Sequence, residues 1–208
     1  MTLYENIAAL LSIGLIQLLA VISPGPSFLI VARTAVAHSQ LEGIKIAIGL
    51  AAGTVIWSGA ALIGLNSLFQ YIPVLFSVMK VIGALFLMWI AVQTFRHAKD
   101  PLELDFAPDT KRQNAVLKGF LTQLANPKVA VFFGSIFIAL LPQHVPAWMV
   151  IALIAIVSFN EFWWYSAVSL CCGAGPIRNL YIRIKSGVDR VTGVFLGALG
   201  LKLLIGSV

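Results

Sequence analysis

Long, unbroken apolar runs are the feature that most constrains this 208-residue chain. A helix needs about 20 mostly apolar residues to cross the hydrocarbon core of a bilayer, and six segments approach or exceed that length. Strands of a membrane barrel would be about 10 residues long with alternating polarity, and these segments do not alternate. The sequence therefore predicts an all-α integral membrane protein with six transmembrane helices: Ile7–Val31, Ile44–Leu65, Val74–Thr94, Phe120–Leu141, Trp148–Leu170 and Val188–Ile205.

Composition indicates that lipid is the solvent around these helices. Hydrophobic residues make up 60% of the chain and charged residues 11%, against about 45–50% and about 25% in an ordinary soluble domain. A soluble domain of this size could not bury so much apolar surface. The net charge of +6 does not indicate a nucleic-acid partner, because the basic residues are spread through loops without interleaved aromatic residues.

The distribution of Lys and Arg predicts the topology. All of these 14 residues except Lys80, Lys128 and Lys202 fall in the first, third and fifth predicted loops. The second and fourth loops, around Asn66–Tyr71 and Pro142–Pro146, contain none. Because Lys and Arg accumulate on the cytoplasmic side of a membrane, we expect the odd-numbered loops in the cytoplasm and both termini outside. The start of the chain has no Lys or Arg, which favours a retained first span over a cleaved signal peptide.

The two halves of the chain repeat the same features in the same order. Each half has a helix break, then tryptophan in the next span, then a basic residue followed three positions later by glycine. These features are Ser23–Pro26, Trp57 and Lys80–Gly83 in the first half, and Asn126–Lys128, Trp163 and Arg190–Gly193 in the second. Breaks at matching places in two repeats point to the binding site of a secondary transporter. Chance similarity among apolar helices is the alternative.

Three spans in each half make the predicted repeat inverted, because a unit with an odd number of spans changes orientation when it recurs. The sequence predicts one transmembrane transporter domain over residues 1–208. The first repeat covers residues 1–98, a cytoplasmic linker covers 99–118, and the second repeat covers 119–208. The linker mixes both signs of charge with two prolines, which is typical of a solvated connection.

The first break, Ser23-Pro24-Gly25-Pro26, is stronger than a single proline kink. It removes two backbone N–H donors within three residues, and freed backbone groups in a membrane need partners in the protein or in a water-lined cavity. We expect a second half-helix to begin near Ser27, with a positive dipole end that favours an anion. Asn126-Pro127 is the second break, with Asn126 as its cap. A kink that only shapes helix packing is the alternative at each break.

Charged residues within the spans indicate where coupling and binding take place. Glu161 is the one acidic residue deep in a predicted span, and a charged group there costs ~2.5–3.5 kcal/mol on the insertion scale, which makes it a candidate functional residue. Burial disfavours the ionised form of a carboxyl group, so we expect Glu161 to exchange protons. Lys128 follows the second break and could bind a substrate carboxylate or pair with Glu161. A structural hydrogen bond from Glu161 to Lys128 or Asn126 is the alternative.

Three other polar side chains complete the predicted site. We expect Asn160 to bind substrate beside Glu161, and Thr54 and Ser58 to line the cavity, although Ser and Thr often bond back to their own helix. The sequence contains no Gly-x-Ser-x-Gly, His-Glu-x-x-His or phosphate-loop motif, which would indicate an enzyme. It has no cluster of His, Cys and carboxylates with metal-ligand spacing. We therefore expect a transporter without cofactor or metal.

Three motifs resemble those of a known family. Ser23-Pro-Gly-Pro-Ser27, Gly49-Leu-Ala-Ala-Gly53 leading to Trp57, and Leu124-Ala-Asn-Pro-Lys-Val-Ala-Val-Phe-Phe-Gly134 are similar to motifs of the lysine exporter (LysE) superfamily. Within it, the chain resembles the homoserine/threonine-resistance branch and in particular the threonine efflux proteins. The resemblance covers essentially the whole chain. It implies an exporter of amino acids in the bacterial inner membrane, driven by the proton gradient.

The resemblance also implies which positions are functional. Ser23–Ser27, Asn126–Lys128 and Glu161 would be the functional positions. Many relatives have Asp where this chain has Thr54, which moves the expected proton coupling to Glu161. We expect export of a neutral, threonine- or homoserine-like amino acid by alternating access. The expected partners are this substrate and the lipid bilayer, without nucleic acid, and a homodimer is left open.

Three other functions stay open at the level of sequence. A membrane thiol-reductant carrier would also have broken spans, but it needs a reactive cysteine in each half, and Cys171 and Cys172 both lie in the second. A metal-ion exporter needs several carboxylates within the membrane, where this chain has one deep in a span. A purely structural membrane subunit would be excluded by transport in liposomes containing only the purified protein.

Overall fold

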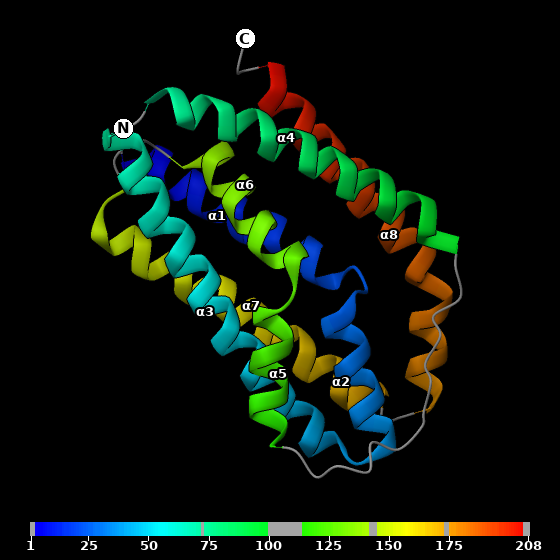
Figure 1. The fold of residues 1–208 in the computed structure, drawn as a ribbon. Helices are drawn as coiled ribbons and strands as arrows, with labels where there is room; N and C mark the ends of the chain where they lie inside the picture. The colour runs from blue at the N-terminus through cyan, green and yellow to red at the C-terminus, as the bar shows by residue number, and fades with distance from the viewer. Residues whose placement is uncertain (1–2, 72, 100–113, 142–144, 173–174, 206–208) are drawn as a thin grey trace.

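A computed structural model describes residues 3–71, 73–99, 114–141, 145–172 and 175–205 of the chain (Figure 1). Every regular element in these ranges is a helix, so the prediction of an all-α protein is confirmed. In chain order the helices are α1 (Leu3–Ile22), α2 (Pro26–Ala37), α3 (Gln40–Tyr71), α4 (Pro73–Arg96), the short 3₁₀ helix η1 (His97–Lys99), α5 (Ala115–Leu124), α6 (Pro127–Leu140), α7 (Ala147–Cys172) and α8 (Gly175–Ile205).

Fewer helices than predicted have the length and composition of a membrane span. In the described part of the chain, four stretches qualify: Leu3–Ile22, Gln40–Gly64, Val81–Lys99 and Ala147–Cys172. The pair α5–α6, bent by 61° at its break, makes a fifth if the two helices count as one span. The sixth predicted span, Val188–Ile205, lies in α8 and is less apolar because it contains Asp189, Arg190 and Lys202.

Both predicted helix breaks are present. α1 ends at Ile22 and α2 begins at Pro26, with Gly25 as N-cap in an extended conformation (φ −151°, ψ −167°). α5 ends at Leu124 and α6 begins at Pro127, where the Asn126 side chain accepts a hydrogen bond from the Lys128 N–H at 3.1 Å. Proline suits the first position of a helix because the N–H that it lacks would have no helical partner there. The prolines therefore begin new half-helices.

Helices also extend into segments that the sequence predicts as loops. The second predicted loop, Asn66–Tyr71, is the last part of α3, and Arg178, Arg183 and Lys185 lie in α8. Helical hydrogen bonding continues past an apolar run because Leu, Gln, Arg and Lys form helices in water as well as in lipid. Most of the predicted linker, residues 100–113, lies outside the described residues, as do 142–144 of the fourth loop. α5 begins at 115, within the predicted linker.

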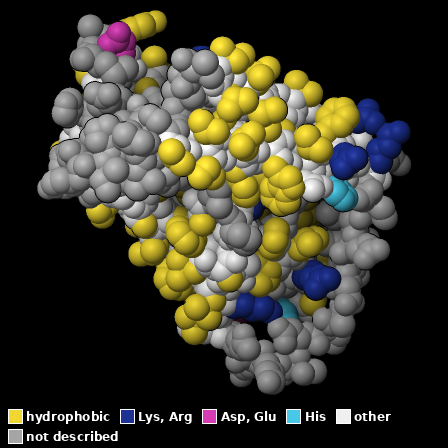
Figure 2. Space-filling view, turned by 45° about the horizontal axis from the view of Figure 1, so that its top comes forward, with side chains coloured by type: hydrophobic (Ala, Val, Ile, Leu, Met, Phe, Trp, Pro, Cys, Tyr) yellow, Lys and Arg dark blue, Asp and Glu magenta, His cyan; other side chains and the backbone are white. Residues whose placement is uncertain are grey.

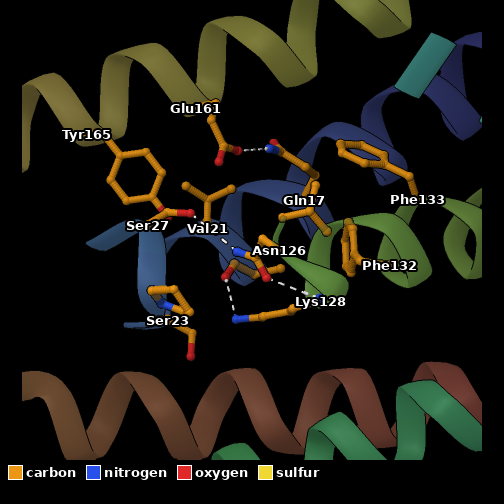
Figure 3. A pocket seen from close by; sticks show the side chains of 14 residues that line it. Gln17, Val21, Ser23, Ser27, Asn126, Lys128, Phe132, Phe133, Glu161 and Tyr165 are labelled. Carbon is orange, nitrogen blue, oxygen red and sulfur yellow. Dashed lines mark hydrogen bonds between the residues drawn. The ribbon is translucent and has the colours of Figure 1, made fainter. Parts of the chain in front are cut away.

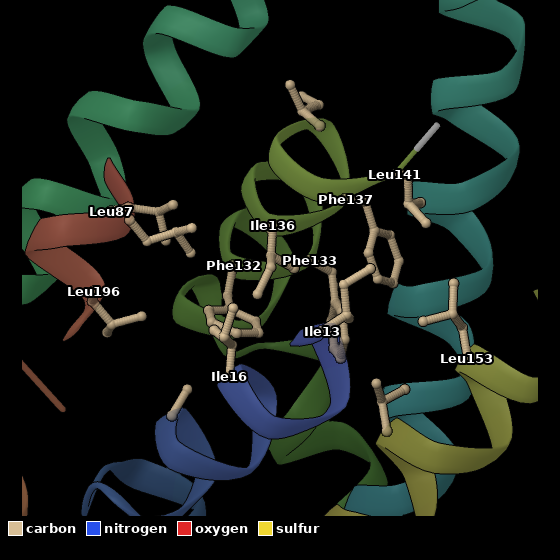
Figure 4. Packing of buried hydrophobic residues seen from close by; sticks show 14 of the residues in the cluster. Ile13, Ile16, Leu87, Phe132, Phe133, Ile136, Phe137, Leu141, Leu153 and Leu196 are labelled. Atoms are coloured by element: carbon tan, nitrogen blue, oxygen red, sulfur yellow. The ribbon is translucent and has the colours of Figure 1, made fainter. Parts of the chain in front are cut away.

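The helices form a bundle in which α6 is surrounded by other helices (Figure 4). Phe133 and Phe137 of α6 are buried in one cluster with Ile13 of α1, Leu87 of α4 and Leu153 of α7. α4 packs along α8, and the two lie side by side along one edge of the molecule (Figure 1). α3 packs against both α5 and α7, and α1 packs against α7. The half-helices after the breaks are thus held from several sides.

Glycines allow α3 and α5 to touch at the level of their backbones. A Cβ atom on Gly49 would collide with the backbone oxygen of Val116, and one on Gly119 would collide with that of Ile46. Small residues permit this kind of close helix contact in membranes. The glycines of the motif Gly49–Gly53 therefore position α5, which ends at the second break.

The outer surface is largely apolar. Ile63, Ile151 and Phe159 are 72%, 70% and 63% exposed, and Figure 2 shows apolar side chains over most of the face in view. Most of the Lys and Arg side chains seen there lie toward the right and the bottom of the view, beside this apolar surface. An apolar surface bordered by basic side chains is typical of a protein embedded in a bilayer.

Candidate functional site

The two helix breaks meet at one small cavity (Figure 3). Gly25, Pro26 and Ser27 of the first break line it together with Asn126 and Lys128 of the second. Ser27 Oγ accepts a hydrogen bond from Asn126 Nδ2 at 3.3 Å, so the breaks are also bonded directly. The small cavity has a volume of about 40 Å³, which holds a few water molecules but not an amino acid.

Glu161 lies at the wall of the small cavity and is almost completely buried, at 3% exposure. Its two carboxylate oxygens accept hydrogen bonds from different helices. Gln123 Nε2 of α5 donates to Oε1 at 2.7 Å, and Gln17 Nε2 of α1 donates to Oε2 at 3.1 Å. These amides, and not Lys128 or Asn126, are the hydrogen-bond partners of Glu161. A buried carboxylate without such donors would be strongly destabilising.

Gln123 connects Glu161 to the first break. Its Nε2 also donates to Thr54 Oγ1 at 2.8 Å, and its Oε1 accepts from Ser27 Oγ at 2.9 Å. All the usual hydrogen-bonding positions of this buried amide except one acceptor lone pair are therefore occupied. The network joins α2, α3, α5 and α7 through the Gln123 side chain. A change in the hydrogen bonds of Glu161 can therefore affect Ser27 through Gln123 alone.

Lys128 occupies a position created by the first break. Its Nζ donates to the backbone oxygen of Ala20 at 3.4 Å. In a continuous helix that oxygen would accept from the N–H of residue 24, but Pro24 has none. Lys128 thus compensates a carbonyl group that the break leaves without its helical partner, and it does so across the interface between the two halves of the chain.

A large cleft of about 480 Å³ opens beside the small cavity, a volume within the ~300–1,000 Å³ range of small-molecule sites. The cavity and the cleft share part of their walls, at Ser23, Gly25, Pro26, Asn126 and Lys128. The other walls come from the first break, α2, α4, η1 and α8, with the side chains Pro24, Leu29, Phe86, Trp89, Ile90, Gln93, Thr94, His97, Lys185 and Asp189.

Asp189 is a second buried acid, which the sequence reasoning missed. It is 4% exposed and lines the large cleft. Its Oδ1 accepts from Ser23 Oγ at 3.0 Å, and its Oδ2 pairs with Lys185 Nζ at 3.1 Å. Lys185 Nζ also donates to the backbone oxygen of His97 at 3.1 Å. This group of side chains ties α8 to the first break and to η1.

Of the predicted site residues whose side chains the structure describes, which leaves out Pro127, three line neither the small cavity nor the large cleft. Asn160 Nδ2 donates to the oxygen of Gly14 at 3.0 Å and to Gln17 Oε1 at 2.9 Å. Thr54 is fully buried, and the Ser58 hydroxyl donates to the Thr54 backbone oxygen at 2.7 Å. Asn160 and Thr54 thus bond to the amides of Gln17 and Gln123 that surround Glu161, and Ser58 bonds back to its own helix.

The site residues that the sequence reasoning missed, Gln17, Gln123 and Asp189, differ in how far the sequence indicates their burial. Gln17 and Gln123 are polar residues within apolar runs, so their positions were a signal that could have been used. Asp189 lies at the start of the sixth predicted span, where an acid would ordinarily be solvated at the membrane surface. Its burial depends on how α8 packs against the first break, which the sequence does not reveal.

Known proteins match over nearly the whole chain. The family described as LysE type translocator matches residues 18–207, which include both breaks. The threonine efflux protein of Escherichia coli (strain K12) is 30% identical over 200 residues, covering 94% of this chain and 97% of that protein. The threonine efflux protein of Salmonella typhi is 28% identical over 198 residues, with 93% and 96% covered.

A leucine efflux protein is similar over a somewhat shorter region. The protein of Klebsiella pneumoniae is 30% identical over 189 residues, covering 85% of this chain and 84% of its own length. No solved structure matches the chain. The extent of these matches confirms the resemblance seen in the motifs. The chain therefore belongs to the family of LysE type translocators, which are transporters and not enzymes.

Proposed function

We propose that this protein exports a neutral, threonine- or homoserine-like amino acid across the bacterial inner membrane by proton-coupled alternating access. The observation that carries the proposal is the meeting of both helix breaks with Lys128 and Glu161 around one cavity, in a chain of this family. Relatives named for threonine and leucine efflux support the substrate class. A zwitterion in a dry site needs partners for a carboxylate and an ammonium, and both signs of charge are present.

The lining of the large cleft supports a neutral substrate. Its charged side chains are Lys128, Lys185 and Asp189. Two cations and one acid disfavour a substrate side chain with a further positive charge. Phe86 and Ile90 of α4 form an apolar part of the wall, against which a short aliphatic side chain can pack.

The direction of transport follows from the proposed topology. The large cleft lies beside His97 and Lys185, next to the third and fifth predicted loops that carry most of the basic residues. The positive-inside rule places these loops in the cytoplasm, so the cleft would admit substrate from the cytoplasm. The start of α1 and the end of α8 both lie toward the top of Figure 1, away from the start of α5. This arrangement supports six crossings, with α8 as the sixth, and both termini outside.

Labelling in intact cells tests this orientation. In a background with Cys171 and Cys172 replaced by Ser, an impermeant thiol reagent should label Tyr4→Cys at the start of α1. It should not label Gly187→Cys in α8. The opposite pattern would reverse the direction in which the cleft faces.

Helix packing supports the inverted repeat, with α1–α4 as one unit and α5–α8 as the other. If the two units are equivalent, each contact in the bundle should have a counterpart when the units are exchanged. α1–α7 corresponds to α5–α3, α2–α7 to α6–α3, and α1–α6 to α5–α2. All six of these contacts are present. α4 and α8 pack against each other. Two prominent pairs depart from this symmetry in the described part of the chain: α4 packs on α6 and α2 packs on α3, whereas α8 does not pack along α2 and α6 does not pack along α7. Lys185 and Asp189 of α8 and Pro26 and Leu29 of α2 instead face the large cleft.

This asymmetry supports a specific alternating-access cycle. Inverted repeats alternate by exchanging their two conformations around a fixed site. The opposite state would therefore have α8 closed on α2 and α4 separated from α6. By the same exchange, α6 would approach α7 and α2 would move away from α3. That movement would close the large cleft and open a path on the other side of Lys128 and Glu161.

Export from liposomes tests the function directly. Purified protein is reconstituted into liposomes loaded with labelled threonine, homoserine, leucine, lysine or glutamate, and efflux is followed with and without a pH gradient. We expect efflux of the neutral amino acids, accelerated when protons can enter as substrate leaves. Protein-dependent efflux of none of the five would overturn the proposed function, and efflux unaffected by the gradient would overturn proton coupling.

The structure offers no specific support for the alternative functions. Cys171 and Cys172 lie at the end of α7 and line neither the small cavity nor the large cleft. Among the described residues, no group of three His, Cys, Asp or Glu side chains could hold a metal ion. Amino-acid export is therefore the one function that we propose.

A further inference from the structure

Of the two spaces described at the breaks, the large cleft is the one big enough for an amino acid in this conformation. The small cavity, where Glu161 lies, holds a few water molecules. Both oxygens of Glu161 also accept hydrogen bonds, from Gln17 and Gln123. An amino acid that enters from the large cleft therefore meets another acid before it reaches Glu161.

That acid is Asp189, and it retains capacity for a further cation. Each of its oxygens has one described partner, Ser23 Oγ or Lys185 Nζ, whereas an ionised carboxylate can accept about four hydrogen bonds. Its partner Lys185 also bonds to the backbone oxygens of His97 and Ala98, at 3.1 Å and 3.4 Å. Lys185 is therefore held by these oxygens as well as by Asp189.

Lys128 supplies the opposite charge in the same cleft. Its ammonium group can donate three hydrogen bonds, and the one described for it is long, 3.4 Å to the oxygen of Ala20. Lys128 and Asp189 both line the large cleft. The cleft thus holds a buried acid bonded to Ser23 and a partly buried lysine bonded to Ala20, two opposite charges beside the first break, as recognition of a zwitterion requires.

We propose that the large cleft is a loading site for the amino acid, in which Asp189 binds the substrate ammonium group and Lys128 binds its carboxylate. This inference rests on the proposed export function and assigns its first binding step. The Ser23–Asp189 hydrogen bond links this binding step to the first break. Because Ser23 belongs to the first break, an ammonium group that binds Asp189 changes the contacts of the break itself. Loading is in this way coupled to the movement of α8 toward α2.

Binding to the purified protein tests this assignment. Calorimetry is done with threonine and with its 2-hydroxy analogue, in which a hydroxyl replaces the ammonium. Asp189→Asn keeps an acceptor for Ser23 but loses the charge, so threonine should bind about tenfold more weakly or worse. Binding of the 2-hydroxy analogue should not weaken. The matched control is Glu42→Gln, a partly exposed acid in the first turn of α3 that pairs with Lys45 and lines neither the small cavity nor the large cleft; it should bind threonine as the wild type does.

Lys185→Met distinguishes recognition from a structural role. If Asp189 serves only to pair with Lys185, both single substitutions should weaken threonine binding equally. If Asp189 binds the ammonium, Lys185→Met removes a competing cation and threonine should bind at least as tightly as in the wild type. Equal losses in the two variants, or unchanged threonine binding in Asp189→Asn, would overturn the assignment alone. A wild-type protein that binds no amino acid would overturn the proposed function and this inference together.

Discussion

Side chains from helices far apart in the sequence determine what Glu161 can do. The carboxylate accepts from the amide groups of Gln17 and Gln123, an arrangement that suits its ionised form. When Glu161 binds a proton, one of its oxygens becomes a donor, and the surrounding amides must offer it an acceptor or turn away. Since Gln123 also bonds to Ser27, protonation reaches the first break through a single residue.

Glu161→Gln is therefore expected to insert normally and to lose the acceleration of export by a pH gradient. The substitution also places an amide donor against one of the two glutamine donors, at a cost of about 1–3 kcal/mol in the free energy of unfolding. Liposome efflux with and without a pH gradient measures the first effect, and thermal unfolding in detergent measures the second. Glu42→Gln is the control. Unchanged export with an unchanged dependence on pH would show that Glu161 is structural.

A substitution at Gly25 tests whether the small cavity and the large cleft are needed for export. Its backbone is extended, and a Cβ atom there would meet nothing within 4 Å, so a side chain can be added without strain. Gly25→Leu should fill the wall shared by the small cavity and the large cleft. We expect normal insertion and stability, but at least tenfold less export.

The matched control for Gly25→Leu is Gly64→Leu. Gly64 lies on the exposed side of α3, where a Cβ atom also meets nothing within 4 Å. Gly64→Leu should export normally. If Gly25→Leu also exports at the wild-type rate, the first break is only a packing feature.

At the scale of elements, the half-helices on either side of the breaks keep their positions because neighbouring helices pack against them. α6 lies among α1, α3 and α4, and α5 is held against α3 by backbone contact at Gly49 and Gly119. Membrane helices gain little from burying apolar surface against each other, because lipid is equally apolar. Close contact between backbones is therefore a main source of helix association here.

Gly49→Leu should accordingly separate α3 from α5. The new side chain collides with the backbone of Val116, which cannot move without shifting α5. Overpacking of this kind costs about 1–3 kcal/mol or more, and it also displaces Gln123. We expect a lower melting temperature and loss of export, measured on purified protein and in liposomes. Gly64→Leu on the same helix should melt like the wild type, and equal melting of the two variants would contradict the role of this contact.

At the scale of the whole molecule, the proposed cycle moves α4 and α8 together against the other helices. α4 packs along α8, so the pair can tilt as one unit. In the present conformation Gly83 of α4 lies against Ser135 of α6, where a Cβ atom on Gly83 would be 3.2 Å from the Ser135 Cβ. This α4–α6 contact is the one that the opposite state should lose.

Cross-linking tests the movement. In a background with Cys171 and Cys172 replaced by Ser, Gly83→Cys with Ser135→Cys should form a disulfide, since the two Cβ atoms need to separate only slightly from 3.2 Å to reach the about 3.5–4.5 Å that a disulfide spans. The oxidised protein should not export, and reduction should restore export. A cross-link within the moving unit, Ala91→Cys with Gly197→Cys, joins α4 to α8 at positions whose Cβ atoms would lie 3.5 Å apart and should leave export intact. Export by the oxidised α4–α6 variant would rule out the proposed separation.

Much of the molecule follows from sequence alone, for physical reasons. Long apolar runs must form helices in lipid, because each backbone N–H and C=O group needs a partner within its own segment. Prolines at positions 24, 26 and 127 must interrupt those helices, since proline lacks the N–H of a helix interior. The helical class, both breaks, Lys128 beside the second break and the burial of Glu161 were predictable for these reasons.

Tertiary packing alone decided the rest of the site. Gln17 and Gln123 reach Glu161 because α1 and α5 pack around α7 and α3. Asp189 is buried because α8 lies against the first break, although its position in the sequence is that of a solvated helix end. Asn160, Thr54 and Ser58 turn away from the cavity for the same kind of reason. A sequence determines where a helix can run and break, but which side chains meet depends on the rotation and tilt of helices that touch only in the folded chain.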